Sequence, residues 1–168
     1  MLLLEMRILI LSILLLFLFS SCSLFKSKEP QLVHCLNENE KNLVLRWGDF
    51  LPKDNAFFGY EINAYGELFI FSKSNKNPEI KKDKIVDLDQ NEFCSKLKLA
   101  KSTILKTQTL FSPGESKARF VEFSNPEQNL NMLAVWNPEF QNKGSRYFRE
   151  LFDSLNCLVP SIREIKNR

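Results

Sequence analysis

The sequence predicts an α+β fold in which an antiparallel sheet of about five strands carries two helices on one face. Several segments alternate apolar and polar residues, the pattern of strands, and two later segments carry apolar stripes at helical spacing. A turn signal, Asn63-Ala64-Tyr65-Gly66, separates two of the strand-like segments. The predicted order is one strand, a hairpin, a helix, two strands and a helix (β-ββ-α-ββ-α), and this order suits a two-layer sandwich.

The first three strands are predicted between residues 43 and 73. Leu43, Leu45 and Trp47 alternate with more polar neighbours, and the next segment places its apolar residues, Phe58, Tyr60 and Ile62, on one parity. Asn at the first position and Gly at the last position of the 63–66 turn suit a type I turn, so we expect Glu67–Lys73 to return as the second arm of a hairpin. Ser74–Lys84 carries Asn77-Pro78 and four lysines and is predicted to be a loop.

A first helix is predicted to begin after Asp89, because Asp89 and Glu92 have the spacing of a capping box. The helix should end before Pro113. Its apolar residues follow at intervals of four, three and four, which places them on one face of a helix: Phe93, Leu97, Ala100 and Ile104.

The last two strands are predicted at Arg119–Phe123 and Leu130–Trp136, on either side of an Asn125-Pro126 turn. Ser145 is expected to cap a final helix that Pro160 ends. The apolar stripe of this helix is a close amphipathic match: Phe148, Leu151, Phe152, Leu155 and Leu158.

Length and charge exclude some classes of protein. The chain has 168 residues, which suits one domain and is short for two. Its 23 basic and 20 acidic residues give a net charge of +3 and a pI near 8.6. Nucleic-acid-binding domains are usually more basic, with a pI above about 9 and clustered bases. We therefore expect no nucleic-acid partner.

The N-terminus carries a short apolar run, from Ile8 to Phe19, preceded by Arg7. A membrane-spanning helix needs about 20 apolar residues, whereas the core of a signal peptide runs to about 7–15. Glu5 is unusual in such a leader, and initiation at Met6 in place of Met1 would give a cleaner signal. A peptide containing Glu5 in mass spectrometry of the protein would exclude the Met6 start.

The segment Phe19-Ser20-Ser21-Cys22 resembles the lipobox of bacterial lipoproteins, with Phe19 where Leu is commonest. This resemblance covers about the first 23 residues. It implies that the Cys22 thiol is diacylglycerated, that the chain is cut just before it, and that the protein is anchored to a membrane of the bacterial cell envelope. Ser23 stands where an Asp often retains such proteins at the inner membrane, which favours the outer membrane if the cell has one.

The predicted organisation is a signal peptide at 1–21, a tether at 22–41 and a single α+β domain at 42–168. The tether is polar and charged, with Pro30 and the run Asn37-Glu38-Asn39-Glu40-Lys41. An apolar patch, Gln31-Leu32-Val33-His34-Cys35-Leu36, interrupts it and is compatible with an edge strand or a segment that covers the domain.

Three cysteines remain if Cys22 is lipidated, and an exported protein reaches an oxidising compartment where one disulfide can form. Cys94 and Cys157 both fall off the apolar stripes of their helices. Antiparallel helices on one sheet face would bring the start of the first near the end of the second, so we favour Cys94–Cys157. A bond from Cys35 to either of them is the competing prediction.

The polar residues form no pattern that indicates a catalytic chemistry, and we expect neither metal nor cofactor. His34 is the only histidine and lies beside Cys35, but adjacent residues in an extended chain point apart, which disfavours a nucleophile–base pair. Asp87, Asp89 and Asn91 resemble the opening of a calcium loop. Lys98 occupies the position at which that loop needs a bidentate carboxylate, so we reject a calcium site.

Phe57, Phe69 and Phe71 lie on the parity opposite to the predicted core residues of their strands. In a two-layer fold one sheet face carries no helix, so these three side chains are candidates for an exposed partner surface. The alternative is that the patch around Leu32 and Val33 covers them. The sequence leaves both interpretations open.

The function predicted from these observations is a membrane-anchored, non-enzymatic binding or interaction module of the bacterial envelope. Its partners would be the membrane, through the lipid, and an envelope protein or ligand. The alternative is an envelope hydrolase that acts on cell-wall or lipid material, and a structural subunit of an envelope assembly would share the features of the first interpretation.

Overall fold

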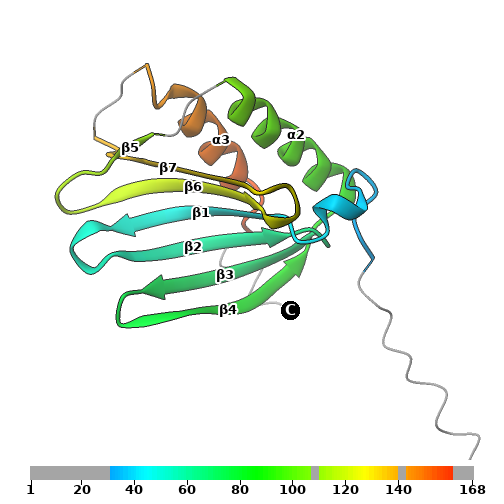
Figure 1. The fold of residues 1–168 in the computed structure, drawn as a ribbon, viewed down its shortest axis with the longest axis horizontal. Helices are drawn as coiled ribbons and strands as arrows, with labels where there is room; N and C mark the ends of the chain where they lie inside the picture. The colour runs from blue at the N-terminus through cyan, green and yellow to red at the C-terminus, as the bar shows by residue number, and fades with distance from the viewer. Residues whose placement is uncertain (1–30, 107–109, 140–142, 161–168) are drawn as a thin grey trace, which may run out of the picture. The chain divides into compact units, whose positions relative to one another are not determined.

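The computed structural model describes residues 31–106, 110–139 and 143–160. These residues form one α+β unit with a mixed sheet of seven strands and two α-helices (Figure 1). The strands are β1 (Val44–Leu51), β2 (Ala56–Asn63), β3 (Glu67–Ser74), β4 (Asn77–Asp87), β5 (Phe111–Ser112), β6 (Ala118–Asn125) and β7 (Leu130–Trp136). The helices are α2 (Gln90–Lys106) and α3 (Arg146–Asn156).

The strands lie in the order β4-β3-β2-β1-β6-β7-β5. All neighbours are antiparallel except β5, which pairs with β7 in parallel. The α+β class is therefore confirmed, while the predicted count of about five strands, their purely antiparallel pairing and the order β-ββ-α-ββ-α are wrong. The chain runs through four strands before α2 and three between α2 and α3.

Two strands were not predicted: β5, which makes the parallel pair, and β4, which begins at Asn77 within the segment 74–84 that we predicted as a loop. Strand β4 is the longer of the two. Its lysines and Pro78 suit a strand at the edge of a sheet, where an unpaired outer edge is protected by charge and by proline. Every residue from Asn77 to Lys84 is exposed, so the strand has no apolar face that would reveal it in the sequence over that stretch.

Local signals in the sequence are confirmed. The Asn63 side chain accepts hydrogen bonds from the backbone N–H groups of Tyr65 and Glu67, and Gly66 takes φ +75°. The Asp89 carboxylate caps α2 by accepting from the N–H groups of Asn91 and Glu92 at 2.9 and 3.0 Å. Ser145 precedes α3 as predicted but makes no cap hydrogen bond through its side chain.

The main core lies between the sheet and both helices. It contains the predicted stripes of α2 and α3 and the residues of one parity from the central strands, including Leu45, Trp47 and Phe123. Figure 1 shows α3 and most of α2 beside β1, β6 and β7, while the start of α2 lies near the ends of β3 and β4. Neither helix of the described ranges is long and apolar enough to cross a membrane.

The domain begins earlier than we predicted. Val33 is buried in the main core, and its N–H donates to the carbonyl of Ala64 at 3.3 Å. Glu40 is also buried and pairs with Lys101 of α2. Residues 31–41, which the sequence assigned to the tether, therefore pack against the domain, and Val33 covers the helix side of the sheet.

Candidate functional site

The helix-free face of the sheet, opposite α2 and α3, was the predicted location of an exposed surface of Phe57, Phe69 and Phe71. The structure does not show such a surface. Phe71 is only 4% exposed, and Phe57 and Phe69 are half-buried. Leu32 and Val33 do not cover them, because these residues pack with the main core on the other side. The expected exposed patch and the expected cover are both corrected.

The three side chains are covered by their own neighbours. Phe57 stacks on Phe50 with ring centroids 4.4 Å apart, and both belong to a second apolar cluster with Phe71 and Phe120. The ammonium of Lys82 lies 4.7 Å above the ring of Phe69. These contacts cover the three phenylalanine rings although no helix packs on this face.

Two facing glycines make this closure possible. Gly48 of β1 pairs with Gly59 of β2, and they continue a row that runs from Phe71 on β3 to Phe120 on β6. With no side chains between them, the two rings meet edge to face at 6.1 Å. A Cβ on Gly48 would lie 2.2 Å from the Phe58 carbonyl oxygen, so only glycine fits.

An ion network covers the rest of the helix-free face. Arg46 donates to Glu61 at 2.7 Å and to Glu122 at 3.0 Å, and Lys82 reaches Glu61 at 2.9 Å. Burial raises the pKa of Glu61, but the hydrogen bonds from Lys82 and Arg46 lower it more, so this pKa lies below its ordinary value of 4.5. Burial likewise lowers the pKa of Arg46, and its pairing with Glu61 and Glu122 raises it more. Both groups are charged at neutral pH.

On the helix-free face, Phe111 of the edge strand β5 lies beside Phe50 and is 63% exposed. A further exposed apolar surface lies on the helix side, where the helices leave the ends of β2 and β3 uncovered. Phe58 is 37% and Ile70 48% exposed there. They belong to the floor of a groove of about 660 Å³ beside α3, which we call the α3 groove. Its floor also includes Tyr60, and Phe152 and Asn156 of α3 form one wall.

Charged residues surround this floor: Asp49, Lys81, Asp83, Lys117 and Arg119. Lys117 pairs with Asp49 at 3.1 Å. Arg119 is half-buried with its guanidinium 4.8 Å above the ring of Phe152. Within the described ranges that guanidinium has no carboxylate within 4 Å, so it is a cation stacked on an aromatic ring with no ion-pair partner among these residues.

The strand register places five groove residues in one row across the sheet. Arg119 is opposite Asp49, Asp49 is opposite Phe58, and Phe58 is followed by Ser72 and then Lys81. The row therefore begins with a cation on β6 and ends with a cation on β4. Between them lie the exposed ring of Phe58 and the carboxylate of Asp49, which forms an ion pair with Lys117.

The end of α3 is held against the sheet beside the groove. The indole N–H of Trp47 donates to the side-chain oxygen of Asn156 at 3.0 Å, and Trp47 itself is buried. The Lys96 ammonium of α2 donates to the Ser154 hydroxyl at 3.0 Å. The groove wall is therefore fixed by contacts to the sheet and to the neighbouring helix.

The two carboxylates of the groove do not form a hydrolytic pair. Asp49 lies on β1 and Asp83 on β4, three strand spacings apart. At about 4.8 Å per spacing this is roughly 14 Å. The acid and base of glycoside hydrolases lie within about 5–10 Å of one another. Within the described ranges no group of three or more His, Cys, Asp or Glu residues is placed to hold a metal ion.

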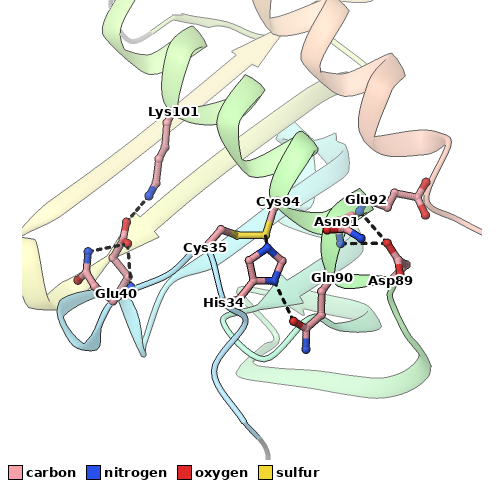
Figure 2. Close-up of a disulfide and its surroundings, with 10 residues drawn as sticks. His34, Cys35, Glu40, Asp89, Gln90, Asn91, Glu92, Cys94 and Lys101 are labelled. Carbon is pink, nitrogen blue, oxygen red and sulfur yellow. Dashed lines mark hydrogen bonds and ion pairs between the residues drawn. A yellow bond between two sulfur atoms is a disulfide. The ribbon is translucent and has the colours of Figure 1, made fainter.

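The disulfide joins Cys35 to Cys94, which was the competing prediction (Figure 2). The favoured Cys94–Cys157 pairing is wrong: Cys157 is a free, exposed thiol whose sulfur lies 3.5 Å from the Asp153 carbonyl. The premise that the start of α2 lies near the end of α3 is correct, as the Lys96–Ser154 contact shows. Cys94 nevertheless faces the 31–36 segment, which the burial of Val33 holds beside α2.

His34 is placed at this disulfide and outside the α3 groove. Figure 2 shows its ring between Gln90 and Cys94. Nδ1 lies 2.9 Å from the Gln90 side-chain oxygen, and Nε2 lies 3.7 Å from the Cys94 sulfur. Because Cys35 is bonded to Cys94, it offers no thiol for the imidazole to activate, which agrees with the interpretation that His34 and Cys35 are not a catalytic pair.

Cys22, both candidate start residues and the predicted signal peptide fall in residues 1–30, outside the described ranges. No protein-family model matches the chain, and a search of curated proteins finds no match either. A function for this protein is therefore inferred from the chemistry of the α3 groove and from the lipobox-like N-terminus.

The α3 groove was not predicted from the sequence. Phe58, Tyr60 and Ile62 were assigned to the core side, which is the correct face, but no local pattern indicated how much of the sheet the helices would cover. Arg119 and Lys117 are the one feature of the sequence that could have indicated this groove. They are basic residues at and just before the start of a strand whose other residues are mostly apolar.

Proposed function

We propose that this protein is a lipid-anchored, non-enzymatic binding module of the bacterial envelope and that the α3 groove is its binding site. The observation that carries the proposal is the combination in this groove of an exposed apolar floor, Phe58 and Ile70, with the half-buried guanidinium of Arg119, which has no ion-pair partner among the described residues. A concave apolar surface with a few convergent polar groups is the usual form of a binding site.

The lipobox-like segment at Cys22 supports the location. Two or more acyl chains give stable membrane attachment, because each buried methylene contributes about 0.8 kcal/mol and a single chain binds only marginally. Ser23 favours the outer membrane in a cell that has one. The domain would then present the groove to other molecules of the envelope.

The anchoring is tested with a Cys22→Ser variant of the full chain. We expect the N-terminal peptide of the mature wild-type protein to begin at residue 22 and to carry the mass of the acyl chains. The variant should lack that mass and keep its leader uncut. A Cys157→Ser variant is the matched control and should behave as wild type. An unmodified Cys22 in mature wild-type protein would contradict the proposal.

The binding role of the groove is tested by a photo-reactive amino acid placed at Ile70 in cells. Ile80 is the matched control, since it is the same residue type, is 38% exposed, lies on the neighbouring strand and does not line the groove. We expect a specific crosslinked product from position 70 and none from position 80. Equal products from both, or none from either, would remove the groove as the binding site.

A further inference from the structure

The geometry points to a ligand class for the α3 groove, and this inference rests on the proposed function. We propose that the groove binds an extended peptide segment of a partner protein, about seven residues long, with an acidic side chain at each end and apolar side chains between them. The segment would cross the strands along the row from Arg119 to Lys81.

The spacing of the two cations sets the length. Arg119 lies on β6 and Lys81 on β4, four strand spacings apart in the sheet. At about 4.8 Å per spacing this is roughly 19 Å, or about six steps of about 3.3 Å between the first and last residues of an extended segment of seven. Positions 1 and 7 lie on the same side of an extended chain, so both acids can face the sheet. One acidic side chain at each end can therefore reach one cation each.

The cations that have no ion-pair partner among the described residues determine the charge expected at the two ends of the peptide. Arg119 has an aromatic ring beneath it and no carboxylate partner within the described ranges, and a carboxylate would supply the bidentate partner that a guanidinium prefers. Lys81 is exposed at the other end. Lys117 is already paired with Asp49, so the first two cations are the ones that a ligand can engage.

The middle of the groove favours an apolar and uncharged segment. Phe58, Tyr60 and Ile70 form the floor, and Phe58 and Ile70 lose exposed apolar surface when they are covered. Asp49 in the row and Asp83 beside Ile70 also line the groove, and both would repel an acid placed between the two cations. A ligand with acids at its ends and apolar residues between matches this order of charges, whereas a uniformly acidic one does not.

The test uses the purified full-length chain in detergent and a fluorescently labelled heptapeptide, Asp-Ser-Phe-Ser-Leu-Ser-Asp, blocked at both termini, in which the two Asp, the Phe and the Leu share one side of the extended chain. Binding is measured by fluorescence anisotropy at low salt. Peptides with Asn at one end, Asn at both ends or Lys at both ends are compared, and so are vesicles of an anionic phospholipid. We expect the peptide with two Asp residues to bind at least tenfold more tightly than the Lys-ended peptide and each single Asn peptide to be intermediate.

Variants of the protein then show which cation binds which end of the peptide. Arg119→Gln should weaken the two-Asp peptide about tenfold and have little effect on the peptide that carries Asn at the Arg119 end. Lys81→Gln should weaken the two-Asp peptide about threefold. Lys98→Gln changes one exposed lysine of α2 outside the groove and should change nothing. Circular dichroism confirms that each variant is folded.

Two results with the peptides would overturn the inference. The first is equal affinity for the Asp-ended and Lys-ended peptides, and the second is tight binding that Arg119→Gln leaves unchanged. Saturable binding of the anionic vesicles with no peptide binding would assign the groove to a lipid and also overturn it. A specific crosslink at Ile70 together with failure of the peptide would contradict this ligand class alone, whereas loss of the Ile70 crosslink would contradict the proposed function itself.

Discussion

The two faces of the sheet differ in a way that the helices alone do not explain. The helix-free face is closed over its central strands, because aromatic side chains fold over the glycine pair Gly48 and Gly59 and an ion network covers the neighbouring residues, and Phe111 is exposed at the β5 edge. The face that carries α2 and α3 leaves Phe58 and Ile70 exposed. A helix layer is therefore neither necessary nor sufficient to bury a sheet face. The α3 groove lies where the helices stop covering the strands.

The largest expected effect is on the glycine pair. Gly48→Ala would place a Cβ 2.2 Å from the Phe58 carbonyl oxygen, so the two strands would have to separate. We expect a loss of at least about 5 kcal/mol in the free energy of unfolding, comparable to the whole stability of many domains. Circular dichroism and urea denaturation measure it.

Gly66→Ala is the control for this substitution. Gly66 has φ +75°, and the nearest side-chain atom, a methyl carbon of Val33, would lie 3.3 Å from the new Cβ. The cost should be about 1–2 kcal/mol, that of a left-handed conformation. Equal losses in the free energy of unfolding at positions 48 and 66 would contradict the view that Gly48 and Gly59 are needed for the close approach of β1 and β2.

The two faces are compared directly by Phe120→Ala and Ile70→Ala. Phe120 is fully buried on the helix-free face, so its truncation should cost about 3–5 kcal/mol. Ile70 is 48% exposed on the helix side, and its truncation should cost less than about 1 kcal/mol. Urea denaturation midpoints measure both. A reversed order would mean that the helix-free face is not closed in solution.

Loss of the disulfide should affect one face more than the other. The Cys35–Cys94 bond joins residues 59 positions apart, and loop-closure entropy for that length corresponds to about 4 kcal/mol, of which about 2–4 is usually realised. A Cys35→Ser and Cys94→Ser double variant should lose hydrogen-exchange protection at Val33 and Leu36. Phe120 should keep its protection. Cys157→Ser is the control and should change neither.

The last comparison concerns the ion network of the helix-free face. The pKa of Glu61 is lowered, so its contribution to stability is complete above pH 4.5 and is lost as the pH falls from there through the folded-state pKa. Glu61→Gln should cost about 1–3 kcal/mol at pH 7 and flatten this part of the pH profile. Urea denaturation between about pH 3 and pH 7 measures both.

Glu67 requires a separate comparison in that experiment. The hydrogen bond from Lys84, and then that from Asn63, lower the pKa of Glu67, so Glu67 titrates in the same direction as Glu61. The informative quantity is therefore the difference between wild type and Glu61→Gln at each pH. A pH profile that the substitution leaves unchanged would exclude Glu61 as a source of the acid sensitivity.

The features that could be predicted from the sequence are those set by neighbours along the chain. The Asn63–Gly66 turn, the Asp89 cap and the two helical stripes depend on residues within one or two turns of each other, and the structure has them. The class α+β follows from those elements together. Parity also assigned Phe57, Phe69 and Phe71 to the correct face, since side chains alternate along a strand.

The remaining features depend on pairings between distant segments. The exposure of Phe71 is decided by the partners of Gly48 and Gly59, which the strand register sets. Strand β4 has no apolar alternation because it lies at an edge, so its lysines favoured a loop. The disulfide depends on the path of residues 31–36 across the sheet, and the α3 groove depends on where the helices lie, neither of which local patterns determine.

The Cys35–Cys94 bond also has a mechanical consequence. A pull on the chain at Gln31 would otherwise peel residues 31–43 from the sheet one contact at a time. The disulfide transmits that tension from Cys35 to Cys94 in the second turn of α2, so the Lys101–Glu40 pair lies farther along the segment than the point at which the force leaves it. Stretched from this end, the domain would therefore resist as a single body, with β1 shielded from the applied force.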